Sequence, residues 1–289
     1  MGKGPIKPKS SYHGSCFIII TKHAKSVAVM QPFWDILGAS VIEHVVDTDK
    51  LGTFSGEVER QGTALDCVKH KCEWSVETLG SKAEYFIASE GSFGPHPLIP
   101  FMPCDHEILY FIDKKRDFNF HLSLLSEKTN YQMQEVESLE ELQLFASEAK
   151  FPSHALILKP MQIDNPMIFK GLDEEASLEY AFKECKKLSH KLWVETDMRA
   201  HMNPSRMAVI NELAGNLAAR LKSRCPSCTT PGWGKIRIEK GLECLGCGMN
   251  TQMIKHEVFG CAKCQYTEKR ERSDGIKHAD PGQCEYCNP

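Results

Sequence analysis

Residues 225–289 carry four Cys-x-x-Cys pairs, which read CPSC at 225–228, CLGC at 244–247, CAKC at 261–264 and CEYC at 284–287. Two intervening residues let both thiolates of a tight turn face one tetrahedral ion, and two such turns complete a four-cysteine zinc site. No apolar signal segment is evident at the N-terminus, so metal ligation is favoured over disulfides. We therefore predict two structural zinc ions, held by Cys225, Cys228, Cys244, Cys247, Cys261, Cys264, Cys284 and Cys287.

The spacing of the pairs leaves open which two share an ion. Fifteen, thirteen and nineteen residues separate successive pairs, and each gap suits a hairpin between two turns. Sequential, nested and cross-braced arrangements are all compatible with these gaps. The compact stretch 244–264, with Gly248 directly after its first turn, favours a nested arrangement in which the first and last pairs close the outer site. Sequential pairing is nearly as well supported.

The charge of this cysteine-rich segment argues against phosphate binding as its main role. It contains nine Lys or Arg and eight Asp or Glu residues. Two sites of four thiolates each add a formal charge of about −2 apiece, so the segment as a whole is acidic. Nucleic acid is therefore not a favoured partner. We expect the zinc ions to supply folding energy to a small core and the segment to contact a protein partner.

The whole chain has an ordinary globular composition. Of its 289 residues 42% are hydrophobic and 25% are charged, and the formal net charge is −3. These values exclude a largely disordered chain, a collagen-like fibre and a coiled-coil rod. Apolar runs such as residues 17–20 are far too short to cross a membrane. We expect a protein of the cytoplasm or the nucleus with no membrane partner.

Hydrophobic periodicity predicts a mixed-sheet α/β domain with a C-terminal two-zinc, four-cysteine ribbon module. We expect residues 1–14 to be disordered, 15–224 to form the α/β domain and 225–289 to form the zinc module. Asn203 is expected to cap, and Pro204 to open, a long helix, and Ser138 with Glu141 is expected to form a capping box at the start of another. The expected strands are 16–20, 41–46, 85–88, 98–102, 107–112, 118–124 and 155–159, and the expected helices are 27–37, 64–79, 138–149, 173–191 and 204–223.

Three polar groups fall where predicted strands end, which is where open α/β sheets bind ligands. The first follows the strand 16–20, and its hydroxyl, ammonium and helix N-terminal amide groups suit a phosphate chain. The second is Glu57 with Glu59, and the third is Glu90 in a turn with Ser89 and Gly91. Carboxylates converging on one point would bind Mg²⁺ and bring it to phosphates. The residues of the first group are Thr21, Lys22, His23 and Lys25.

Each group also has a simpler interpretation. The lysines could form a solvated helix start, the two glutamates could form a solvated loop, and Glu90 could cap a turn.

Two further groups carry the same ambiguity. Cys104 and His106 could bind a metal, or Cys104 could act as a nucleophile, whereas a loop beside a strand is the simpler view of His96, Cys104, Asp105, His106 and Glu107. We still expect Asp105 or His106 to lie near the pocket. Arg199, His201 and Arg206 form either an anion site or a hydrogen-bond network at the start of a helix.

Taken in order, these motifs resemble the inosine-triphosphate pyrophosphatase superfamily across residues 15–224. Those proteins open with a strand and a T-x-N-x-x-K loop, and this chain has TKHAK at 21–25, with His23 in place of the Asn. An acidic segment and a Lys-bearing helix follow, here ERQGT at 59–63 and KHKC at 69–72. The chain then has ASEG at 88–91, and PSRMA at 204–208 where the family has Ser-His-Arg.

This resemblance implies roles for individual residues of the chain. Thr21 and Lys25 would contact phosphates, Glu59 and Glu90 would hold Mg²⁺, Lys71 would contact phosphate, and Arg206 would contact the base or the phosphates. Glu57 is included only because it lies close to Glu59 in sequence. The implied activity is a nucleoside-triphosphate pyrophosphatase, a hydrolase acting on phosphoanhydrides.

The chain is also identified as a member of the family called domain of unknown function 6671. Three phrases carry this resemblance: ASEGSFGPHP at 88–97, RAHMNPSR at 199–206 and CPSC at 225–228. The sequence thus supports two hypotheses. One is a Mg²⁺-dependent hydrolase of a nucleotide or another phosphorylated small molecule, with a fused zinc module. The other is a non-catalytic adaptor whose zinc ribbon contacts a protein or a nucleic acid.

Overall fold

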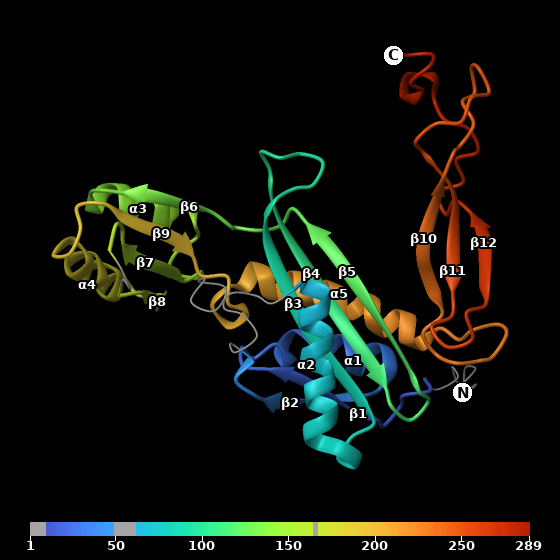
Figure 1. The fold of residues 1–289 in the computed structure, drawn as a ribbon, viewed down its shortest axis with the longest axis horizontal. Coiled ribbons are helices and arrows are strands. Elements are labelled where there is room, and N and C mark those ends of the chain that lie inside the picture. Colours follow the sequence, from blue (N-terminus) through green and yellow to red (C-terminus); the bar gives the residue numbers. More distant parts are fainter. Residues whose placement is uncertain (1–9, 49–61, 164–166) are drawn as a thin grey trace, which may run out of the picture.

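The computed structural model describes residues 10–48, 62–163 and 167–289 (Figure 1). The first sheet has the strand order β2-β1-β3-β4-β5. Strands β1 and β2 run parallel, as do β1 and β3, whereas β4 pairs antiparallel with both β3 and β5. The fold is therefore the predicted mixed-sheet α/β architecture. The strands are β1 (Cys16–Thr21), β2 (Ser40–Val45), β3 (Tyr85–Pro95), β4 (Pro103–Asp113) and β5 (Phe118–Ser126).

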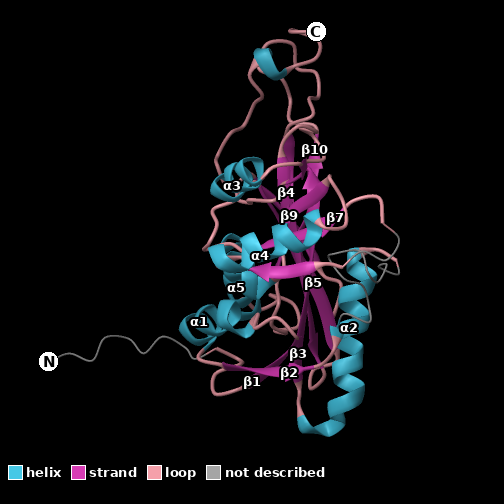
Figure 2. Ribbon diagram, turned by 90° about the vertical axis from the view of Figure 1, so that its left-hand side faces the viewer, coloured by secondary structure: helices cyan, strands magenta, loops and turns pink. Residues whose placement is uncertain are grey.

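Helices cover both faces of this sheet (Figure 2). Helices α1 (Ser26–Leu37) and α5 (Pro204–Lys222) pack on one face, where aromatic rings such as Phe17 and Phe111 form the core. Helix α2 (Ala64–Leu79) packs on the other face through Val68 and Cys72. Burying both faces explains why strand 16–21 is almost continuously apolar. None of the described helices is long and apolar enough to cross a membrane.

A second sheet with its own core lies within residues 133–196 (Figure 1). Its strand order is β6-β9-β7-β8, and all described pairings are antiparallel. Helices α3 (Leu139–Glu148) and α4 (Glu175–Lys186) share one apolar core with it. The strands are β6 (Met133–Val136), β7 (Leu156–Pro160), β8 (Phe169–Leu172) and β9 (Leu192–Thr196).

Several sequence expectations are wrong in detail. Residues 98–102 form the tip of the β3–β4 hairpin instead of a strand, because Pro97 and Pro100 interrupt the segment and Leu98 and Phe101 are exposed. The helix expected at 173–191 ends at Lys186, and the chain turns there into β9. Strand β3 does not end at Ala88. It leaves β1 there and continues to Pro95 paired with β4 alone, which places Glu90 within a strand.

The cysteine-rich module is a three-stranded antiparallel sheet that leads away from the end of α5 (Figure 1). Its strands are β10 (Gly234–Lys240), β11 (Ile254–Gly260) and β12 (Thr267–Glu271). Its near end packs on the first sheet. The Arg220 guanidinium lies 4.3 Å from the Phe120 ring centroid, and its Nε donates to the Gly232 carbonyl at 3.0 Å. Gly232 has a φ of 96°, and a Cβ at this position would meet Phe120 at 3.0 Å, so glycine suits this close approach.

Helix α5 begins at a buried cap that also holds the second sheet in place. The Asn203 Oδ1 accepts from the Arg206 amide at 3.0 Å, and its Nδ2 donates to Asn130 Oδ1 at 2.8 Å. Asn130 in turn donates to the carbonyl of Ala149, at the end of α3. The predicted cap thus joins α5 to the segment that leads into the second sheet.

We predict that Asn203→Ala lowers the free energy of unfolding by about 2–4 kcal/mol, because it removes a cap and orphans a buried amide. Urea denaturation would measure this. Ser138→Ala is the matched control, since Ser138 caps α3 in an exposed capping box. It should cost only about 1 kcal/mol. Equal losses in the two variants would contradict a linking role for Asn203.

Candidate functional site

The predicted phosphate loop and the Glu90 segment meet where β1 ends. Ile20 of β1 lies opposite Ala88 of β3, so the residues that follow each of them are adjacent in space. The loop from β1 to α1 contains Ala24 with a φ of 52°, a left-handed conformation that costs a residue with a Cβ about 1–2 kcal/mol. Such strain is found where a loop shape is functionally constrained. The structure therefore brings together two groups that are far apart in the sequence.

Lys71 and Glu90 form an ion pair on the α2 side of the sheet. The Lys71 Nζ lies 2.5 Å from Glu90 Oε2, and the side chains are only 10% and 13% exposed. Lys71 comes from the middle of α2 and Glu90 from the part of β3 that has left β1. Two residues that the sequence singled out for phosphate and metal binding are thus direct partners.

Arg206 and Glu107 form a second ion pair on the opposite face, between α5 and β4. The Arg206 Nε donates to Glu107 Oε1 at 2.6 Å, and the two side chains are 7% and 1% exposed. The guanidinium also donates to the Met198 carbonyl and lies 5.0 Å from the Phe93 ring centroid. Both partners lie over Gly91, where a Cβ would overlap the Arg206 Nη2 and Glu107 Oε1 atoms. Glycine at 91 therefore makes room for the pair.

Lys25 lies between the two ion pairs and has no carboxylate partner among the described residues. Its buried Nζ makes one long hydrogen bond, 3.4 Å to the Ser89 carbonyl. Burial, and then the nearby Arg206 cation, lower the pKa of Lys25 to about 7, and Lys71 acts in the same direction. An anion bound beside Lys25 would favour its charged form.

The remaining residues of the predicted loop have different environments. The Thr21 hydroxyl is buried and accepts from the His23 amide at 3.0 Å. Lys22 pairs with Asp47 at 2.8 Å, with 43% and 49% of the side chains exposed, so this pair contributes about 0–1 kcal/mol. His23 stacks on His201, with ring centroids 5.0 Å apart. The first amide of α1, that of Ser26, donates to the Glu43 carboxylate, so it is not available to a phosphate in this conformation.

Glu57 and Glu59 lie outside the described residues, so their relation to Glu90 stays a prediction.

The Cys104 group is less reactive than the sequence allowed. Cys104 is buried, its thiol donates to the Pro95 carbonyl, and burial raises its pKa. His96 accepts from the Leu98 amide in the hairpin turn. Arg199 binds the buried Asp197 through two guanidinium nitrogens. This contact is part of a hydrogen-bond network at the start of a helix, which was the simpler of the two interpretations of this group.

Two acidic residues of β4, Asp105 and Glu107, lie beside this site. The sequence analysis expected Asp105 or His106 near the pocket and assigned no role to Glu107. Asp105 and Glu107 are 0% and 1% exposed, and both lie on the α5 face of the sheet. Glu107 is the partner of Arg206, which the sequence did not reveal. The available signal was an acidic pair two residues apart directly before the apolar run 108–112, where strand alternation puts both side chains on one face.

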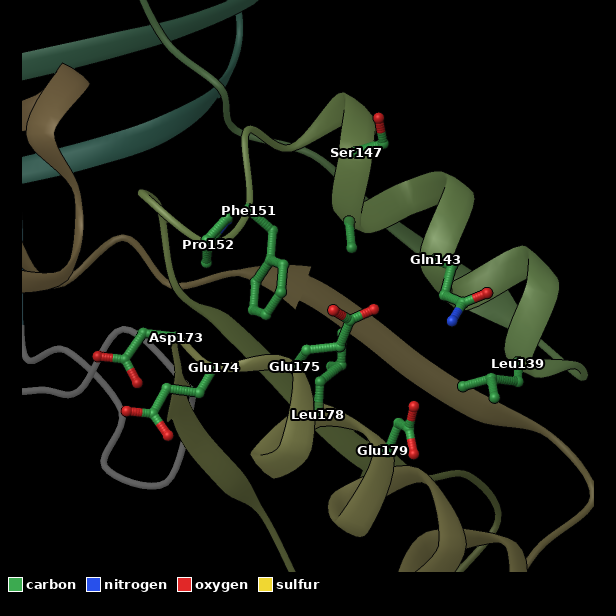
Figure 3. Close-up of a pocket in the computed structure, with 11 residues that line it drawn as sticks. Leu139, Gln143, Ser147, Phe151, Pro152, Asp173, Glu174, Glu175, Leu178 and Glu179 are labelled. Carbon is green, nitrogen blue, oxygen red and sulfur yellow. The ribbon is translucent and has the colours of Figure 1, made fainter.

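A cavity of about 740 Å³ lies elsewhere, between α3 and α4 (Figure 3). Figure 3 shows Phe151, Leu178 and the Glu175 carboxylate directed toward its centre. Its lining contains four acidic side chains and no cationic one. It includes none of the predicted site residues and is not suited to phosphate. The lining residues are Leu139, Gln143, Ala146, Ser147, Phe151, Pro152, Asp173, Glu174, Glu175, Leu178 and Glu179.

The eight paired cysteines form two compact clusters, Cys225/Cys228/Cys261/Cys264 and Cys244/Cys247/Cys284/Cys287. The Sγ–Sγ distances across the pairs are 3.7 and 3.6 Å in the first cluster and 3.8 and 3.6 Å in the second. A tetrahedral zinc with Zn–S bonds of about 2.3 Å would set thiolates about 3.8 Å apart. The donor set and the spacing therefore fit two zinc ions.

The pairing is cross-braced, so the nested arrangement favoured by the sequence is wrong. Strand β10 carries the chain from the first turn to the second, β11 carries it back to the third, and β12 carries it out again to the fourth. Seven extended residues span about 23 Å, so consecutive turns lie at opposite ends of the sheet. Each gap is a single strand crossing instead of the expected hairpin, and alternate pairs form one cluster.

The two clusters have unlike surroundings. The near cluster packs beside Trp233 and Phe259, and Ala262, inside its second turn, packs against the core of the first sheet. Lys263 of the same turn donates to the Arg116 carbonyl. At the far cluster, Leu245 and Tyr286 lie inside the two turns and are 70% and 75% exposed. The near cluster therefore fastens the module, whereas the far cluster presents apolar side chains to solvent.

Residues 71–289 match the family described as Domain of unknown function (DUF6671), so the chain belongs to that family. The match includes Lys71, Glu90, Arg206 and all eight paired cysteines, and it leaves the Thr21–Lys25 loop outside. It confirms the resemblance carried by the three phrases at 88–97, 199–206 and 225–228. No curated protein matches the chain.

Cross-bracing predicts how double substitutions change the metal content. Cys225→Ser with Cys261→Ser removes two ligands of one ion, so the purified protein should lose one metal equivalent. Cys244→Ser with Cys261→Ser removes one ligand from each cluster and should lose two equivalents. Elemental analysis after gel filtration would measure both. Nested pairing requires the second double variant to lose only one equivalent, which would contradict the geometry.

Proposed function

We propose that the protein binds the phosphate chain of a nucleoside triphosphate where β1 ends and hydrolyses it to a monophosphate and pyrophosphate. The observation that carries this proposal is the convergence of Lys25, Lys71 and Arg206 beside strands β1 and β3. Only two of these cations have a carboxylate partner among the described residues, which leaves Lys25 to be neutralised by a ligand. A buried cluster with more cations than carboxylates favours the binding of an anion.

Each of these residues has a distinct task in this proposal. Lys25 contacts a phosphate oxygen and takes up a proton as it does so, because the anion stabilises the ammonium. Lys71 exchanges Glu90 for a phosphate oxygen. Arg206 is already held by Glu107, so it approaches the ligand as a fixed, oriented cation. Phosphoryl transfer depends on such positioning and charge stabilisation more than on covalent chemistry by the protein.

A divalent cation belongs to the proposal as well. Carboxylate oxygens are the ligands that Mg²⁺ prefers, and Glu90 would hold it, together with Glu59, once Lys71 has turned to the phosphate. When bound, Mg²⁺ would polarise the phosphate that is attacked by water. The two zinc ions have a structural task, because the near cluster joins the module to the first sheet.

The first test is a screen of standard, deaminated and modified triphosphates with Mg²⁺ while pyrophosphate release is followed. We predict release from a subset of them and a loss of at least about a hundredfold in Glu90→Gln. Glu84→Gln is the matched control, because Glu84 forms an exposed ion pair with Lys115 in the same domain. No release and no thermal shift with any nucleotide would disprove the hydrolase proposal.

The second test concerns the protonation of Lys25. Because burial and the nearby Arg206 lower the pKa of Lys25 to about 7, Lys25 should contribute more proton uptake on binding of pyrophosphate at pH 8 than at pH 6. Calorimetry in buffers of different ionisation enthalpy measures this uptake. Lys25→Arg stays charged, so it should retain affinity and lose the uptake. Equal uptake by both proteins would exclude Lys25 as the phosphate contact.

A protein-contact function of the module is a second candidate. It is favoured by Leu245, Met249 and Tyr286, which expose large apolar side chains around the far cluster. Exposed apolar groups concentrated at one end of a small domain are typical of a protein-binding surface. An adaptor function alone would leave the protein without triphosphate turnover, so the nucleotide screen also separates the two candidates.

A further inference from the structure

Unsatisfied oxygen atoms are concentrated beside the proposed phosphate site. Within the described part of the chain, five buried side-chain atoms have no hydrogen-bond partner, and four of them belong to Ser89, Asp105 and Glu107. They are the Ser89 hydroxyl, both carboxyl oxygens of Asp105 and Oε2 of Glu107. Buried polar groups are normally paired, so such a concentration requires an explanation.

Asp105 and Glu107 are neighbours on one face of β4. They are two residues apart in a strand, so their side chains point the same way. Glu107 Oε1 is held by Arg206, and no described donor reaches its other oxygen or Asp105. The Arg206 guanidinium, which could serve Asp105, is already engaged by Glu107 and the Met198 carbonyl.

Two ionised carboxylates in this position would be costly. Each would lose its hydration, and the two would repel one another while sharing a single committed cation. A proton on Asp105 removes one charge and creates a donor for the unsatisfied oxygen of Glu107. We infer that Asp105 and Glu107 share one proton at neutral pH, and that this proton keeps the neighbouring phosphate site positively charged.

The groups that face Asp105 agree with this arrangement. Burial, and then the Glu107 carboxylate, raise the pKa of Asp105 to about 8, whereas Arg206 and Lys25 act in the opposite direction. With Asp105 neutral, the cations Lys25, Lys71 and Arg206 face the carboxylates Glu90 and Glu107. Ionisation of Asp105 would cancel the excess positive charge. The effect of Asp105 on the charge of the phosphate site rests on the proposed function, whereas the shared proton does not.

Asp105 is thus a positioning residue that acts through Glu107 and Arg206, and Asp105→Asn is its direct test. The amide cannot ionise, yet it can donate to Glu107 as the protonated acid does. Between pH ~4 and ~8, Asp105 is protonated in the folded wild type and ionised in the unfolded chain. This proton contributes stability that is present at low pH and is lost as the pH rises through about 8.

We predict that the folding equilibrium constant of the wild type falls by up to about tenfold per pH unit relative to Asp105→Asn between pH 5 and 8. Urea unfolding at several pH values measures this difference. The expected companion result is that affinity for pyrophosphate falls more steeply between pH 7 and 9 in the wild type than in the variant, because Lys25 loses its proton in both proteins whereas Asp105 ionises only in the wild type. Infrared spectra at pH 6.5 should show a protonated carboxylic acid in the wild type that Asp105→Asn lacks.

The matched control is Asp113→Asn on the same strand. Asp113 is also 0% exposed, but it accepts hydrogen bonds from Tyr12 and Arg116, so its substitution should destabilise the fold at neutral pH. If Asp105→Asn destabilises as much as Asp113→Asn at pH 7, or if chelation of metal ions destabilises the wild type but not Asp105→Asn, Asp105 is ionised and the inference is overturned. The same holds if the acid band is absent.

Different experimental outcomes would contradict the phosphate site and the shared proton. If pyrophosphate does not bind at any pH but the stability difference and the acid band appear, the shared proton stands and the phosphate site is wrong. If pyrophosphate binds with the Lys25-dependent uptake but Asp105→Asn leaves the pH dependence of stability unchanged, the phosphate site stands and the shared proton is wrong.

Discussion

The buried ion pair between Arg206 and Glu107 is the contact on which the arrangement of the chain depends. It fixes the first turn of α5 against β4, and every other unit is attached to that helix. The capping residue Asn203 bonds to Asn130, at the start of the segment that forms the second sheet. The far end of α5 leads within three residues to Cys225 and the cysteine-rich module. Removing one partner of such a pair would leave an uncompensated buried charge, which costs several kcal/mol.

The same pair explains the electrostatic character of the candidate site. Arg206 neutralises Glu107, and Lys71 neutralises Glu90, on opposite faces of the sheet. Among the described residues, what remains at the end of β1 is a buried lysine without a carboxylate partner and an aspartate without a donor. Neither group is stable there in its charged form unless something joins it. In the proposed arrangement, a phosphate beside Lys25 and a proton on Asp105 meet these two requirements. They favour each other, because the proton removes a negative charge that would repel the phosphate, and the bound anion favours the protonated form of Asp105.

The cysteine-rich module works by a different principle. Three strands with solvent on both faces bury little apolar surface, so metal ions bound at the two cysteine clusters would hold the sheet together. Cross-bracing distributes each cluster over segments distant in sequence, so neither site closes until the sheet has formed. One end is used to dock on the first sheet through Ala262 and Lys263. The other end repeats the same turn geometry but exposes Leu245 and Tyr286 to solvent.

The sequence by itself determined which residues are chemically notable and which elements they belong to. Four Cys-x-x-Cys pairs predicted two metal sites because the spacing is a local property of a turn, and the caps of α3 and α5 were correct for the same reason. The sequence also indicated that Thr21, Lys25, Lys71, Glu90 and Arg206 belong together, but not how they pair. Only the tertiary structure decided that Lys71 meets Glu90, that Arg206 meets Glu107, and that alternate cysteine pairs form one cluster. Those partners are set by strand register and strand direction, which depend on contacts between distant segments and leave no trace in local spacing.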